Sequence, residues 1–207
     1  LHQLDEDYKG AIESFNLWLD LTMNNVSVKG DVRIANIQLN LAQNNIYAFR
    51  FSEALKHSKL AADFLVKGSK THYMLMEQDF YANLYGGELK DAREISIELV
   101  EAAATHGFKN KGPQWNFFAA AAEYLNGNYK TARKYLMETG GLRSDREGFN
   151  IAIRVFEIIL DIDSEKFDVA DSQINNLRQF IKEGLKDSEV RKRDLLILQI
   201  LLDLRRA

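Results

Sequence analysis

A short segment recurs five times along the chain, and its spacing constrains the fold more than any other feature. Each copy carries an aromatic residue or a leucine three positions before an alanine, and the alanines lie at positions 11, 54, 92, 132 and 170. The steps between them are 43, 38, 40 and 38 residues. A period in this range is typical of stacked repeats, in which each unit buries its apolar face against its neighbours. We therefore expect an array that presents an extended surface to other chains.

Each period contains the pattern of two helices. After each alanine, apolar residues recur at spacings of three and four, as they do along one stripe of an amphipathic helix. Before the alanines, further helices are expected over 32–47, 73–85, 115–125 and 151–162, and no run shows the alternation of a strand. Gly87 and Gly127 fall between paired helices, where a left-handed backbone is easiest for glycine. The pattern predicts an all-α fold of antiparallel helix pairs with the alanines at helix–helix contacts.

The fourth copy resembles the tetratricopeptide repeat (TPR) family. Its matching residues are Gly127, Asn128, Tyr129, Ala132 and Leu136. In an earlier unit Leu41 and Ala42 match the family's leucine and small residue, whereas Phe49 and Arg50 stand where glycine and an acidic residue are expected. The units are also longer than those of the family, and they lack its closing proline. The resemblance implies an α-α superhelix, a TPR-like solenoid, that ends in a capping helix.

The repeat spacing also predicts how the chain is organised. We expect one repeat domain over 1–207 that is a fragment of a longer chain, because the first unit lacks its first helix and Leu1 is not a methionine. The expected parts are a partial repeat at 1–28, repeats at about 29–69, 70–110, 111–142 and 143–186, and a terminal helix at 187–207.

Composition and motifs argue against an enzyme. The chain has no cysteine, which excludes disulfides, thiolate metal sites and thiol catalysis. It contains no phosphate-binding glycine loop, no His-Glu-x-x-His and no nucleophile elbow, and its four histidines have no ligand spacing. We therefore expect no catalytic residue, no cofactor and no metal ion.

Charge and hydropathy limit the classes of partner that are expected for this chain. The 27 basic and 30 acidic residues give a net charge of −3 and are spread over both halves of the chain, so no basic face for nucleic acid is expected. No apolar run reaches the ~18 residues of a membrane span, so no membrane insertion is expected. These features predict a cytoplasmic protein whose partner is a protein or peptide.

The resemblance implies a groove lined by the first helix of each pair. Amide side chains there can hydrogen-bond a peptide backbone, and tyrosines add rigid contact area with a polar tip. The alternative is that the tyrosines are core between repeats and the amides are merely solvated. The candidate groove residues are Asn36, Leu39, Gln43, Tyr47, Glu77, Tyr81, Tyr85, Gln114, Phe117 and Tyr124.

The last helix carries more apolar residues than a terminal cap needs. Leu195, Leu198 and Leu202 are candidates for self-association, because large exposed apolar patches usually mark interfaces. In the alternative interpretation the helix is wedged against the preceding pair. A homodimer through this helix is therefore one of two hypotheses.

Together these features predict a non-catalytic scaffold that binds a protein or peptide on the concave face of a TPR-like array. The alternative is a regulatory or sensory segment of a larger signalling or transcription-regulating protein. An effector domain elsewhere in the full-length chain would favour the second hypothesis.

Overall fold

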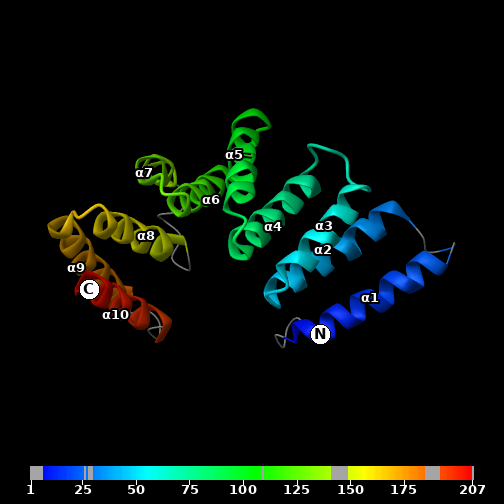
Figure 1. Ribbon diagram of the computed structural model, residues 1–207, viewed down its shortest axis with the longest axis horizontal. Helices are drawn as coiled ribbons and strands as arrows, with labels where there is room; N and C mark the ends of the chain where they lie inside the picture. The colour runs from blue at the N-terminus through cyan, green and yellow to red at the C-terminus, as the bar shows by residue number, and fades with distance from the viewer. Residues whose placement is uncertain are drawn as a thin grey trace. The chain divides into compact units, whose positions relative to one another are not determined.

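The structure is a computed structural model that describes residues 7–25, 27, 30–108, 110–140, 149–184 and 192–206. Over these residues the chain is all-α, with ten helices and no strand, which confirms the predicted class. The chain forms two compact units, Leu1–His106 and Gly107–Ala207, which are described separately below (Figure 1). The expectation of one continuous array over 1–207 stays a prediction.

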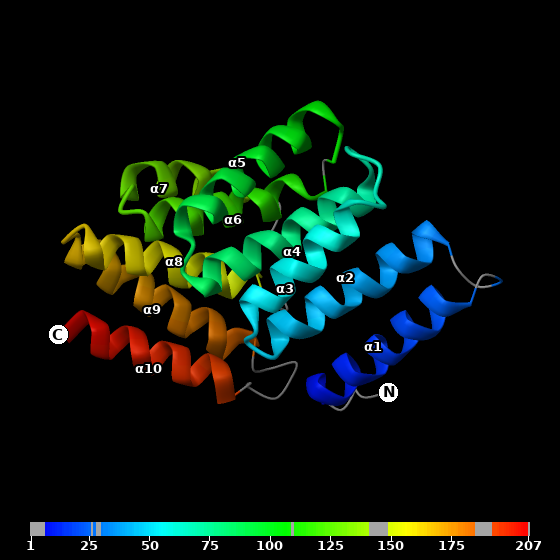
Figure 2. The same cartoon turned by 45° about the vertical axis from the view of Figure 1, so that its right-hand side comes forward.

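Unit 1 is a series of helices in which each packs against the next. Its helices are α1 (Tyr8–Asn24), α2 (Asp31–Tyr47), α3 (Phe51–Ala62), α4 (Lys70–Gly86) and α5 (Leu89–Thr105). The first helices of successive pairs, α2 and α4, also contact each other (Figure 2). Between α1 and α2 the core contains Ile12, Ile37 and Leu41, and further along it contains Leu39, Ala61 and Leu75.

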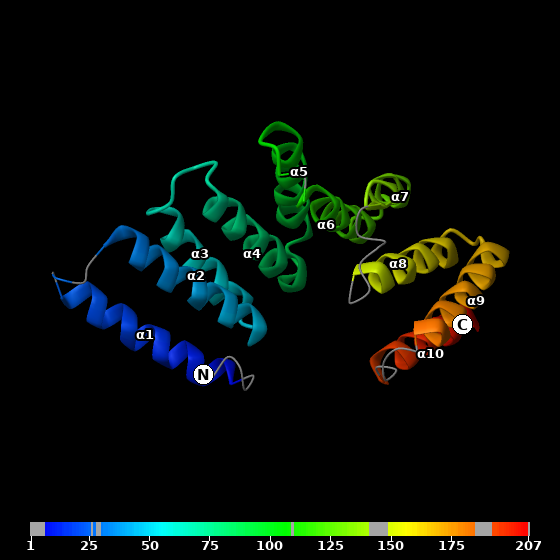
Figure 3. The ribbon, with the colours of Figure 1, turned by 180° about the vertical axis from the view of Figure 1, so that it is seen from behind.

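Unit 2 repeats this arrangement (Figure 3). Its helices are α6 (Gly112–Leu125), α7 (Tyr129–Met137), α8 (Phe149–Asp163), α9 (Phe167–Gly184) and α10 (Lys192–Arg206). Two helix pairs, α6 with α7 and α8 with α9, are joined by contacts between α7 and α8, and α10 packs on both α8 and α9. The predicted first helices over 32–47, 73–85, 115–125 and 151–162 all fall within observed helices.

The five repeat alanines occupy one structural position. Each is the fourth residue of its helix, and in each case its backbone N–H donates to the carbonyl of the residue just before the helix at 3.0 Å. Every one is buried, with at most 4% of its surface exposed. Their burial agrees with the prediction that they lie at helix–helix contacts, where a small side chain lets two backbones approach closely.

The four turns inside the pairs share one backbone geometry. Each contains a residue with positive φ, and the next N–H donates to a carbonyl five residues earlier at 2.8–2.9 Å, as in a Schellman motif. The predicted left-handed backbone at Gly87 and Gly127 is confirmed, with φ of 89° and 79°. Phe49 and Glu165 adopt the same conformation, with φ of 58° and 57°, although they have side chains.

The residue whose carbonyl accepts this hydrogen bond is polar and buried in all four turns. It lies nine positions before the repeat alanine and is at most 6% exposed. This second repeated position is hard to recognise in the sequence, because a polar residue near a turn is usually assigned to the surface. Its occupants are Asn45, Asn83, Glu123 and Asp161.

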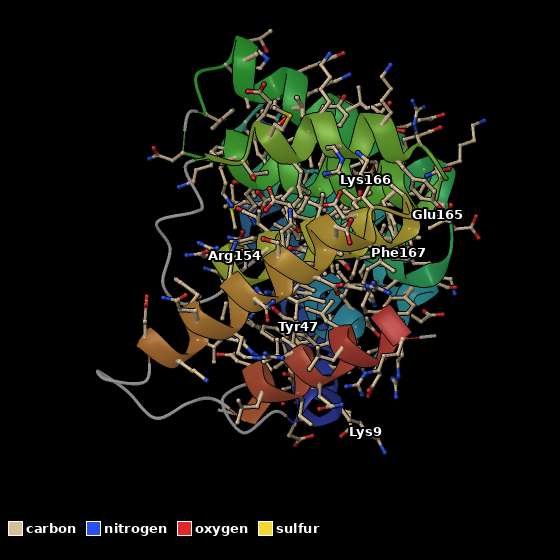
Figure 4. The ribbon with its side chains drawn as sticks, turned by 90° about the vertical axis from the view of Figure 1, so that its left-hand side faces the viewer. Lys9, Tyr47, Arg154, Glu165, Lys166 and Phe167 are labelled. Carbon is tan, nitrogen blue, oxygen red and sulfur yellow. The ribbon has the colours of Figure 1, made fainter. Side chains whose placement is uncertain are left out.

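Glu165→Gly is expected to raise the free energy of unfolding by about 0.5–1 kcal/mol. A left-handed residue with a Cβ costs roughly 1–2 kcal/mol, and the greater freedom of glycine in the unfolded chain offsets part of the gain. Figure 4 shows Glu165 with Lys166 and Phe167 at the turn between α8 and α9. Urea denaturation of the variant and the wild type gives the difference.

The reciprocal change serves as the control. A Cβ added at Gly127 meets no atom within 4 Å, so the cost of Gly127→Glu comes from the backbone alone. It is expected to destabilise the protein by about 1–2 kcal/mol. Equal stabilities for all three proteins would contradict the assignment of strain to these turns.

Candidate functional site

Helices α2 and α4 of unit 1 carry seven of the ten predicted groove residues and lie against each other. On α2, Asn36 is exposed, and the half-buried Gln43 donates from Nε2 to the Tyr47 hydroxyl at 3.2 Å. Tyr47, at the end of α2, is 47% exposed, and its ring lies 5.1 Å from that of Tyr8. This part of α2 therefore presents amide and phenol groups.

Four aromatic side chains, Phe49, Phe51, Tyr81 and Tyr85, form a cluster that we call the aromatic patch. The rings of Tyr81 and Tyr85 are nearly parallel, at 7°, with centroids 6.1 Å apart. The Phe51 ring lies 6.2 Å from that of Tyr85 and 6.2 Å from that of Phe49. The patch joins the start of α3 to the last two turns of α4.

A close approach of backbone to side chain builds the patch. A Cβ on Gly86 would lie 3.3 Å from the Cβ of Phe51, so glycine at the end of α4 leaves room for the ring of Phe51. Phe51 and Tyr81 are half-buried, and they support the outer rings of Phe49 and Tyr85, which are 82% and 61% exposed. The patch thus consists of two half-buried rings and two exposed rings that pack beside them.

Phe49 is the residue of the patch that folding explains least. Its equivalents in the other turns are Gly87, Gly127 and Glu165, and it alone places a large apolar ring in the left-handed conformation. A bulky residue there is a genuine outlier, and such outliers cluster at functional sites. In the sequence, Phe49 is a departure from the family pattern and is not among the predicted groove residues. The available signal was an aromatic residue at a glycine position.

The structure corrects one groove residue of unit 1. Leu39 is 8% exposed and packs with Ala61 and Leu75, so it belongs to the core. Glu77 is half-buried on α4, one helical turn before Tyr81. The predicted groove residues that reach the surface of unit 1 are therefore polar or aromatic.

The three candidates in unit 2 make internal contacts. Gln114 accepts a hydrogen bond from Lys111 Nζ at 3.1 Å, and Phe117 packs edge-on against Phe156 at 5.9 Å. The Tyr124 ring packs against Phe156, and its hydroxyl donates to Asp163 at 2.6 Å. Burial, together with this bond, raises the pKa of Tyr124. For Phe117 and Tyr124 the alternative, core packing, describes the structure better than a groove.

The three candidates on α10 differ in exposure. Leu198 is 8% exposed and packs into the core with residues of α8 and α9, so it is not available for self-association. Leu202 is half-buried beside the same core, and Leu195 is 52% exposed. For Leu198 the alternative interpretation, in which the last helix packs against the preceding helix pair, describes the structure. Other residues form the exposed face of this helix.

One carboxylate of unit 1 has an unusual environment. Asp79 lies on α4, and burial raises its pKa from 3.8 to about 6, an effect that Ser58 on α3 partly offsets. Its Oδ1 is buried without a hydrogen-bond partner among the described residues. Near neutral pH the Asp79 carboxylate is therefore charged although it is largely shielded from water.

Asp79→Asn is expected to stabilise the protein by about 2–3 kcal/mol at pH 7.5. Because the folded-state pKa lies above the unfolded one, the folded state binds the proton more tightly. The contribution of Asp79 to wild-type stability is therefore greatest below pH 3.8 and falls as the pH rises through 6. Urea unfolding of both proteins between pH 4 and pH 8 measures this difference.

The advantage of the variant should shrink to less than about 1 kcal/mol near pH 4, where the carboxyl is protonated in the folded state and partly protonated in the unfolded state. Asp20→Asn, at an exposed carboxylate on α1, is the matched control and should shift stability by less than about 0.5 kcal/mol. A stability gain from Asp79→Asn that is equal at pH 4 and pH 8 would disprove the assignment to burial of charge.

The described residues contain no group of three or more histidine, aspartate and glutamate side chains placed to hold a metal ion. A membrane-spanning segment is not found among the described helices, since each is too short or too polar to cross a bilayer. Comparison with protein-family models, curated proteins and solved structures found no match for this chain. The resemblance to the tetratricopeptide repeat therefore stays a prediction from the residues.

Proposed function

We propose that this chain is a non-catalytic protein-binding module of the TPR-like solenoid type. We further propose that an extended peptide docks on the aromatic patch and the adjoining surface of α2. The observation that carries this proposal is Phe49, an 82% exposed aromatic ring held in a left-handed backbone conformation. Neither its exposure nor its backbone favours folding, so a contact outside the fold accounts for it best.

The repeated turns and alanines support the solenoid part of the proposal. A shared hydrogen-bond pattern in four turns makes each helix pair a similar unit, and similar units stack in a similar way. In unit 1 the first helices α2 and α4 contact each other, which supports a shared binding surface formed by their outward residues. The surface lies on a scaffold that is already ordered, which lowers the entropic cost of binding.

The side chains on this surface favour an extended peptide over a charged partner. Asn36 and Gln43 carry amides, which can both donate to and accept from a peptide backbone. Tyr47, Tyr81 and Tyr85 have flat rings with polar tips and few rotatable bonds, as residues at recognition surfaces often do. Apolar or prolyl side chains of the peptide would stack on the exposed rings of the patch.

Selection from a library of random linear peptides tests the proposal. Peptides enriched on the wild type are expected to lose at least about tenfold in affinity for Phe49→Gly and for Tyr85→Ala, the loss typical of an aromatic anchor. Phe49→Gly is the sharper variant, because it should raise stability, as Glu165→Gly does, while it weakens binding. Calorimetric titration with a selected peptide measures the affinity.

Phe64→Ala is the matched control. Phe64 is 37% exposed in the connection after α3, and its loss should leave the affinity unchanged within about twofold. The proposal fails if the library yields no enriched peptide. It also fails if the selected peptides bind Phe49→Gly as tightly as the wild type.

A further inference from the structure

Helix α10 exposes a second apolar surface, on the side that faces away from its core contacts. Leu196, Ile200 and Leu204 are 63%, 57% and 48% exposed, whereas Leu198 and Leu201 are buried against α8 and α9. We call the three exposed residues the α10 stripe. They are spaced four apart, so they lie on nearly the same side of the helix.

The order of residues in the α10 stripe is palindromic. It consists of Leu, Ile and Leu at equal spacing, with Ile200 in the centre. An interface between two copies related by a twofold axis is self-complementary, since residue i meets j and j meets i. A twofold axis through Ile200 places Leu196 of one copy against Leu204 of the second copy when the two helices are antiparallel.

A second feature of this region lies between α10 and α8. A cavity of about 320 Å³ opens between the two helices and is lined mainly by apolar residues, among them Ile151, Val155, Ile159 and Ile197. A specific dimer buries about 800 Å² on each partner, which is more than one helix face supplies. The cavity gives room for side chains of a second copy, and their insertion would add to the area that the stripe buries.

Polar residues border the stripe. Gln199 and Asp203 are exposed and joined by a hydrogen bond of 3.0 Å, and Arg206 is exposed near Asp203. A polar rim around an apolar centre is the usual composition of a protein interface. Leu198, a predicted self-association residue, is buried and takes no part in this surface.

We infer that the protein forms a twofold dimer through the α10 stripe and the cavity between α8 and α10, with the two α10 helices antiparallel. This inference is independent of the peptide site, which lies in unit 1. It replaces the predicted set Leu195, Leu198 and Leu202 with residues that the fold leaves exposed.

Cysteine cross-linking of the whole chain tests the geometry, because the chain has no cysteine of its own. Under mild oxidation Ile200→Cys should form a covalent dimer, since its two copies meet at the axis within disulfide range. Leu196→Cys and Leu204→Cys should each cross-link poorly alone and efficiently when mixed. Leu60→Cys, on α3 and 47% exposed, is the matched control and should stay monomeric on denaturing gels.

Sedimentation velocity tests whether the dimer depends on the stripe. Ile200→Glu should raise the dimer dissociation constant at least about 100-fold, because it buries a charge at the axis, and should leave the thermal unfolding of the monomer unchanged. Leu60→Glu should leave the dimer intact. A wild type that is monomeric at the highest concentration, an open series of larger species, or cross-linking of Leu196→Cys with itself would each overturn the inference.

Discussion

Replacing Ala132 by leucine is expected to lower the free energy of unfolding by about 3 kcal/mol or more, at the upper end of the usual cost of overpacking. Ala132 is fully buried in a cluster that joins α6, α7 and α8, where Ala120 and Leu136 are also fully buried. Three additional carbon atoms have no space there, so the helices must separate or adopt strained rotamers.

Tryptophan fluorescence can follow this effect in unit 2 alone. The chain has two tryptophans, Trp18 in unit 1 and the buried Trp115 in unit 2. In a Trp18→Phe background, urea unfolding monitored through Trp115 reports on the unit that contains the mutation. Thr131→Leu, at the exposed neighbour of Ala132 on α7, is the matched control and should change stability by less than about 0.5 kcal/mol. An unchanged midpoint for Ala132→Leu would show that this position is not a tight helix contact.

Arg133→Met is expected to destabilise unit 2 by about 3 kcal/mol, because it leaves a buried carboxylate without its cation. The Arg133 guanidinium on α7 lies 2.5 Å from Oδ1 of Asp161 on α8, and the Asp161 side chain is only 2% exposed. The other carboxylate oxygen, Oδ2, is buried with no hydrogen-bond partner among the described residues. The pair therefore links two successive helix pairs through a group that water does not solvate.

The double variant Arg133→Met, Asp161→Leu separates this explanation from a loss of packing. Removing both charges should recover most of the stability, since apolar replacements for a buried ion pair are often neutral or favourable. The control is Arg206→Met, which breaks an exposed pair with Asp203 and should cost less than about 0.5 kcal/mol. A double variant as unstable as Arg133→Met would assign the effect to the methylene groups of the arginine.

Much of the fold could be predicted from periodicity. The spacing of the alanines, the three- and four-residue apolar pattern and Gly87 and Gly127 correctly located the helices and two of the four turns. These features are local, since helix periodicity and left-handed turns depend on residues close in sequence. The turns at Phe49 and Glu165 did not have the glycine that identifies such a conformation.

The candidate site was harder to predict, because surface and core share residue types in a helical repeat. Tyr81 and Tyr85 joined an exposed patch, whereas Tyr124 at a comparable position packs against Phe156. Both helices have a tyrosine as their penultimate residue, Tyr85 on α4 and Tyr124 on α6. Only the distance to the neighbouring helices decides whether such a ring remains accessible.

The sequence by itself determined the all-α class, the pairing of helices and the small residue at each close contact, because these depend on local propensity and on a repeated spacing. Tertiary structure alone decided which side chains of each helix remain exposed. It placed Leu39 and Leu198 in the core and left Phe49 and Ile200 at the surface. The physical reason is that burial depends on neighbours distant in sequence, and periodicity identifies an apolar face without identifying what covers it.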